Sequence, residues 1–137
     1  MKRLLLPLLV LLLLAAANPG FCEQTSFHTV KLPLSPGRQV KAVLTLNDDH
    51  KAVEVEPAKG ARISVPYGKI EKVAYEYTLQ VMGGKEHWLR IDYNDGEGHK
   101  VLLLQMSGHD YIKILDAVKA HTGFDPEVLG NADRGPK

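Results

Sequence analysis

Three polar residues of one expected hairpin are of the types that carry out acid–base hydrolysis. Asp92, Asp95 and His99 lie close together in the chain, and carboxylates and imidazoles are common proton donors and acceptors in enzymes. The sequence therefore permits a hydrolase with its site near these residues. A turn explains part of the pattern equally well, because Asp side chains in turns bond to nearby backbone. The preference of Asp for turns also explains Asp48 and Asp49 without a catalytic role.

The histidines do not have the spacing of a metal site. No two of them are separated by one or three residues, the spacings that place two imidazoles on one face of a strand or helix; the six are His28, His50, His87, His99, His109 and His121. Gly96 and Gly98 belong to a hairpin and not to a phosphate-binding loop. We expect no metal, no cofactor and no enzymatic activity.

A tryptophan and an arginine form the strongest candidate for partner binding. Leu89 and Ile91 alternate with Trp88 and Arg90, so Trp88 and Arg90 lie on the opposite face of a strand from the apolar pair. Trp and Arg are enriched among the residues that dominate protein interfaces. An alternative is that sheet curvature buries Trp88 beneath a loop.

The first 22 residues have the pattern of a secretory signal peptide. Lys2 and Arg3 precede an apolar run that is short for a membrane-spanning helix, and Pro19 follows it. Small residues permit cleavage after Ala17 or after Cys22. We expect an exported protein, periplasmic or extracellular. Membrane attachment would require an uncleaved signal or lipidation of Cys22.

The positive net charge of the chain comes from this segment. Two of the 17 basic residues lie in it and none of the 16 acidic ones does, so the remaining chain is nearly neutral. A nucleic-acid-binding domain would carry a basic surplus, and we expect no nucleic-acid partner. The single cysteine excludes a disulfide framework within the chain.

Residues 23–106 have the alternating pattern of short antiparallel strands. The expected strands are 27–32, 40–46, 53–56, 61–65, 72–77, 88–93 and 101–106, with breaks or turns at 33–37, 47–50, 57–60, 66–68, 83–84 and 95–96. The continuously apolar strand at 101–106 predicts cover on both faces. In the last hairpin we expect Tyr93 to pair with His99 and Ile91 to face Val101.

The period changes to that of a helix near the end of the chain. Ser107 and Asp110 have the spacing of a capping box, and Gly123 is a natural stop. Tyr111, Ile114, Leu115 and Val118 form an apolar stripe that Ile112 widens. We expect a helix at 107–123, a single domain over 23–123, and a flexible tail over 124–137.

This order resembles that of bacterial pleckstrin-homology-like domains over residues 61–123. The similarity lies in the segment Ile63–Val73, with Pro66 and Tyr67 at its centre, followed by Trp88–Tyr93 and the helix. The chain also resembles small uncharacterised secreted proteins of soil bacteria. The resemblance implies a β-barrel or roll of six to seven antiparallel strands closed by one C-terminal α-helix.

Function does not follow from such a fold. Lipid-binding family members have a cluster of basic residues near the first turn, where this chain offers only Arg38 and Lys41. The leading hypothesis is an exported, non-enzymatic module that binds a protein or peptide at the cell envelope through Trp88 and Arg90. The alternatives are a carrier that holds an apolar ligand or lipid in the barrel interior, and the hydrolase at Asp92, Asp95 and His99.

Overall fold

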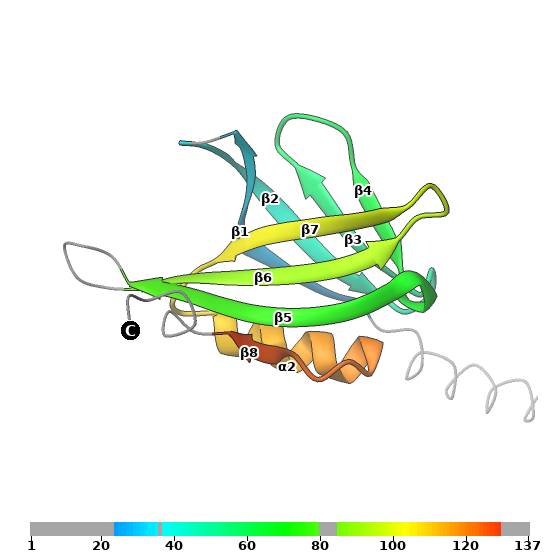
Figure 1. Ribbon diagram of the computed structural model, residues 1–137. Coiled ribbons are helices and arrows are strands. Elements are labelled where there is room, and N and C mark those ends of the chain that lie inside the picture. The colour runs from blue at the N-terminus through cyan, green and yellow to red at the C-terminus, as the bar shows by residue number, and fades with distance from the viewer. Residues whose placement is uncertain (1–23, 36, 80–84, 130–137) are drawn as a thin grey trace, which may run out of the picture.

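The computed structural model describes residues 24–35, 37–79 and 85–129, which form one strongly bent sheet and one helix (Figure 1). Residues 1–23, which include the expected signal peptide and Cys22, and the expected turn at 83–84 lie outside these residues. The elements, in chain order, are β1 (Gln24–Ser35), β2 (Arg38–Asn47), β3 (Ala52–Pro57), β4 (Ile63–Pro66), η2 (Tyr67–Lys69), β5 (Ile70–Leu79), β6 (Lys85–Asn94), β7 (His99–Met106), α2 (Tyr111–Thr122) and β8 (Glu127–Leu129). The expected mainly β fold with one helix late in the chain is confirmed, but the described residues form eight strands, not six or seven, and the last of them pairs in parallel.

The sheet has the strand order β4-β3-β2-β1-β7-β6-β5-β8. In Figure 1 the strands of its first half cross those of its second half, so the sheet folds over on itself. The alternation of apolar side chains explains the inner face: Ala42, Leu44 and Leu46 of β2 are buried, with Val53 and Val55 of β3 beside them.

The first strand is longer than predicted. It continues through Pro33 to Ser35, where the sequence favours a turn. Proline is tolerated there because β1 pairs with β7 only at Val30 and Lys31, so the amide that Pro33 lacks is not needed by β7.

The β6–β7 hairpin is offset by one residue from the expected register. Tyr93 pairs with Lys100 and Ile91 pairs with Leu102, because the loop occupies residues 95–98. This offset also corrects the prediction for residues 101–106. Leu102, Leu104 and Met106 are buried, whereas Val101 is exposed, so β7 alternates and is not covered on both faces.

The helix begins later than predicted and ends where predicted. The Ser107 hydroxyl accepts a bond from the Asp110 amide and so stabilises a turn before α2, not the helix itself. Gly123 ends the helix at a φ of 82°, and its amide bonds to the Lys119 carbonyl. Ile112 is exposed and does not belong to the buried stripe.

The helix fills the space beneath the bent sheet. Ile114 and Val118 are fully buried against inner-face residues that include Leu44, Leu89 and Ile91. Burying an aliphatic side chain of this size stabilises a fold by about 1.5–3 kcal/mol. The sheet and the helix therefore share one core.

The segment after the helix is not entirely a flexible tail. Glu127–Leu129 form β8, which pairs in parallel with Ala74, Tyr75 and Glu76 of β5. Ala74, which pairs with Glu127 of this strand, is buried. The prediction of a tail is wrong for these three residues, and residues 130–137 lie outside the described part.

Candidate binding surface

Trp88 lies on the outer face of the sheet, as the alternation in β6 predicts. Its neighbours across the strands are Glu76 of β5 and Gln105 of β7, while Leu89 and Ile91 are fully buried on the other face. The indole is partly exposed. The structure thus places the sole tryptophan at the surface of the central part of the sheet.

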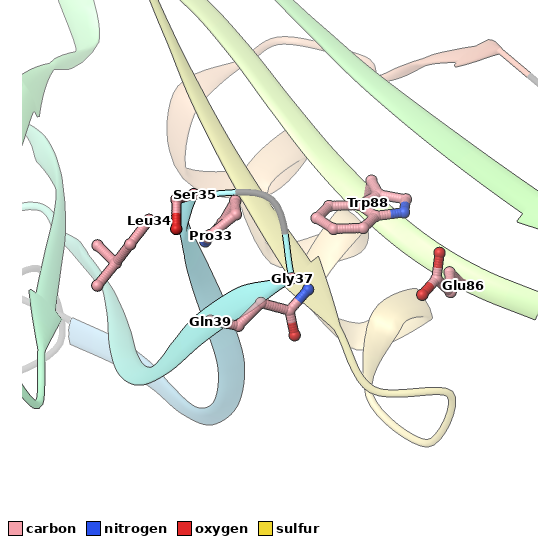
Figure 2. Close-up of a pocket in the computed structure, with 7 residues that line it drawn as sticks. All are labelled: Pro33, Leu34, Ser35, Gly37, Gln39, Glu86 and Trp88. Atoms are coloured by element: carbon pink, nitrogen blue, oxygen red, sulfur yellow. The ribbon is translucent and has the colours of Figure 1, made fainter.

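A groove of about 510 Å³ runs between Trp88 and the tip of the β1–β2 hairpin (Figure 2). Figure 2 shows the indole facing Pro33 and Ser35 across this groove, while the Leu34 side chain points away. The groove is lined by Pro33, Leu34, Ser35, Gly37, Gln39, Glu86 and Trp88. It combines an aromatic wall, a proline and a few polar groups, which suits an extended peptide.

Arg90 lies on the same face but is engaged by carboxylates. Its Nε donates to Asp92 Oδ1 at 2.9 Å, and its Nη1 lies 3.8 Å from Glu76 Oε2. The hydrogen bond to Asp92 and the two negative charges raise the pKa of the Arg90 guanidinium. Its charge is thus balanced locally, and Trp88 is the stronger candidate of the two predicted residues.

Beside this groove lie Lys31, which sequence reasoning did not select, and Lys41, which it considered only as part of a sparse basic cluster near the first turn. A second hollow, lined by Lys31, Gly37, Gln39 and Lys41, shares Gly37 and Gln39 with the first. Lys31 lies directly opposite Lys41 in the β1–β2 register. The sequence shows no basic run, because these lysines are ten positions apart and meet only through the hairpin.

Each of the three residues of the hydrolase hypothesis interacts with a group outside that set. Asp92 is bound to Arg90, and His99 Nδ1 lies 3.3 Å from a Glu71 oxygen. Asp95 accepts a bond from the Glu97 amide, and that bond lowers the pKa of its carboxyl. Each side chain therefore has a partner of its own, and none of the hydrogen bonds or ion pairs among the described residues joins two of the three.

A polar cluster that the sequence did not indicate joins the two ends of the domain. His121 Nδ1 lies 2.8 Å from Asp48 Oδ1, and His121 Nε2 lies 3.0 Å from Thr25 Oγ1. The Tyr67 hydroxyl also donates to Asp48. The hydrogen bond to His121 is the main cause of a lowered pKa at Asp48. The cluster ties the helix end to β1 and to the β2–β3 turn.

A buried histidine takes part in an aromatic stack below the helix start. The His87 and Tyr111 rings are 3.8 Å apart and nearly parallel, and Tyr75 Oη lies 2.7 Å from His87 Nδ1. Burial lowers the pKa of His87. The stack is part of the packing between sheet and helix.

No three potential metal ligands of the His, Cys, Asp or Glu type gather in the described part of the chain. Nor does it contain a helix with the length and apolar character needed to cross a membrane. The inner face of the sheet is filled by packed side chains, and the hollows described above lie on its outer surface.

The bent sheet and its C-terminal helix define a pleckstrin-homology-like fold. A chain in the structure of the Spt16D Pob3N heterodimer is similar to this one, with a TM-score of 0.54 and 16% sequence identity. The similarity covers 85% of this chain and 60% of that chain. At this identity the likeness shows the fold alone. No protein-family model matches the sequence, and no curated protein matches it.

Proposed function

We propose that the protein is an exported, non-enzymatic domain that binds a protein or peptide at the cell envelope. The observation that carries this proposal is the groove at Trp88, where a partly exposed indole faces Pro33 on an outer surface. Tryptophan in such a setting offers a large apolar area at a small entropic cost. The leader-like start of the sequence supports export.

Affinity capture from envelope extract tests the binding function. The mature protein is expected to retain a partner that Trp88→Ala loses. Val101→Ala is the matched control, because Val101 is an exposed apolar residue on the same outer face. Equal capture by the two variants, or no capture by the unaltered protein, would contradict the proposal.

Mass spectrometry of the mature protein tests export. A processed N-terminus after Ala17 or Cys22 is the expected result. A full-length chain would contradict signal cleavage, and a diacylglyceryl mass on Cys22 would identify a lipid-anchored protein instead.

A further inference from the structure

One row of outward residues crosses the sheet from β2 to β6. Lys41 pairs with Lys31 on β1, Lys31 pairs with Gln105 on β7, and Gln105 pairs with Trp88 on β6. Lys31 therefore lies two strands from Trp88 and Lys41 lies three strands from it, on the same face of the sheet. Neighbouring strands are about 4.8 Å apart.

The lysine pair is not neutralised by the described part of the chain. Both side chains are exposed, and none of the ion pairs among the described residues includes either of them. Like charges directly opposite each other on antiparallel strands destabilise the pairing. An anion bound between Lys31 and Lys41 would relieve this repulsion.

The charge along the groove is polarised. The hollow at the lysine pair shares Gly37 and Gln39 with the hollow at Trp88, so the two hollows lie next to each other. Glu86 lies at the Trp88 end. An acidic ligand group is therefore favoured at the lysine end and disfavoured beside the indole.

We propose that the groove binds an extended acidic segment of a protein partner. Acidic side chains of the segment contact Lys31 and Lys41, and an apolar side chain packs between Trp88 and Pro33. The amide of Gln39, where the two hollows meet, is available to the main chain of the segment. This inference rests on the proposed function and names the chemistry of the partner.

The geometry sets the spacing of the recognised residues. Two to three strand separations amount to about 10–14 Å, and an extended chain advances about 3.3 Å per residue. The acidic residues should therefore lie three to four positions from the apolar residue. A lipid headgroup or an anionic polysaccharide would supply negative charge without this paired apolar requirement.

Fluorescence titration with synthetic peptides tests the inference, since Trp88 is the only tryptophan of the chain. The probes are eight-residue peptides that carry one leucine and two glutamates three and four positions away, in either direction. Matched peptides carry lysines at those positions, or place the glutamates beside the leucine. We expect saturable binding only of the peptides whose glutamates lie three and four positions from the leucine. Added salt should weaken this binding, because it screens charges over a Debye length of about 10 Å at 0.1 M.

The double variant Lys31→Glu/Lys41→Glu should weaken binding of the glutamate peptide by about tenfold or more and admit the lysine peptide. Lys59→Glu/Lys113→Glu makes the same change in net charge at exposed lysines outside the groove, and should bind like the unaltered protein. Equal weakening by both double variants, or no binding of any peptide, would overturn the inference.

Further measurements separate this inference from the proposed function. If capture from envelope extract requires Trp88 but not Lys31 and Lys41, the proposed binding function stands and the proposal of an acidic segment is overturned. Binding of anionic lipid vesicles or heparin through the lysines, without peptide binding, would overturn the protein partner.

Discussion

At the scale of single residues, His87 is a titratable group that packs like a core side chain. It is buried on β6, stacks on Tyr111 and contacts the Tyr75 hydroxyl. Burial disfavours the charged imidazolium and lowers the pKa of His87 below its ordinary value of 6.5. The unfolded chain therefore binds a proton at this residue more readily than the folded protein.

This difference predicts a loss of stability on acidification. As pH falls below about 6.5, the unfolded state gains a proton at His87 that the folded state resists, so the free energy of unfolding decreases. Urea denaturation at pH 7.5 and pH 5 measures the loss. His87→Gln should reduce this pH dependence, and His109→Gln, at an exposed histidine, should leave it unchanged. The same change in the free energy of unfolding between pH 7.5 and pH 5 in the two variants would contradict the prediction.

Asn47 organises a buried polar site at the β2–β3 turn. Its side-chain oxygen accepts bonds from the Asp49 and His50 amides, and its nitrogen donates to Glu54. The bond between Glu54 and His50 is the main cause of the lowered pKa of the Glu54 carboxyl. Alternation in β3 predicts Glu54 at the solvent face, yet it is 7% exposed. The pattern could not reveal that a turn and Arg62 cover it.

Asn47→Ala should therefore be costly for a single polar substitution. Loss of this side chain leaves two turn amides and a buried carboxylate oxygen without their partner, which typically costs about 1–3 kcal/mol in the free energy of unfolding. Asn94→Ala is the control, because Asn94 is exposed and its side chain accepts a single bond within the described part of the chain, from the Gly96 amide in the β6–β7 loop. Denaturant unfolding of both variants measures the difference, and equal losses would refute the assignment.

At the scale of elements, Gly123 at the end of α2 allows the energetic cost of a positive φ to be measured without any steric clash. Gly123 has a φ of 82°, and a methyl group added there would meet nothing within 4 Å. Gly123→Ala should destabilise by about 1 kcal/mol because the left-handed conformation disfavours a side chain. Gly68→Ala has equally open space without a positive φ and should be nearly neutral. Thermal unfolding measures both variants, and equal decreases in their Tm would contradict this prediction.

The elements show what a hydrophobic pattern can and cannot specify. Alternation placed β2 and the inner face of β6 correctly, because burial of one face imposes a period of two, whereas β4 begins at Ile63 and not at Ala61. It misplaced the β6–β7 register by one residue, since register also depends on the loop. Asp95 and Gly98 stay in the loop, with Gly96 and Gly98 at positive φ. A strand of three residues such as β8 is too short to have a period.

At the scale of the whole molecule, the candidate groove combines predictable and unpredictable parts. The outward position of Trp88 follows from one strand and was accessible from the sequence. The paired lysines were not, because Lys31 and Lys41 come together only through the β1–β2 register. Arg90 was selected by residue type, but its carboxylate neighbours on β5 and β6 balance its charge. Local patterns thus identify faces, whereas sites depend on which strands lie side by side.

The Asp48–His121 pair connects segments far apart in the sequence and should contribute to the stability of the whole domain. Asp48→Asn removes the charge that faces His121 and should lower the free energy of unfolding by about 1–3 kcal/mol near neutral pH. Asp49→Asn alters the adjacent exposed carboxylate, which has no side-chain partner among the described residues, and should have little effect.

The pH dependence distinguishes this pair from a general effect of charge. Because the pKa of Asp48 is lowered in the folded protein, its contribution is complete above the ordinary value of 3.8 and is lost as pH falls through the lower folded value. The difference in stability between the unaltered protein and Asp48→Asn should therefore shrink below pH 3.8. Denaturant unfolding between pH 7 and pH 3 measures it, and a constant difference would show that Asp48 acts through packing alone.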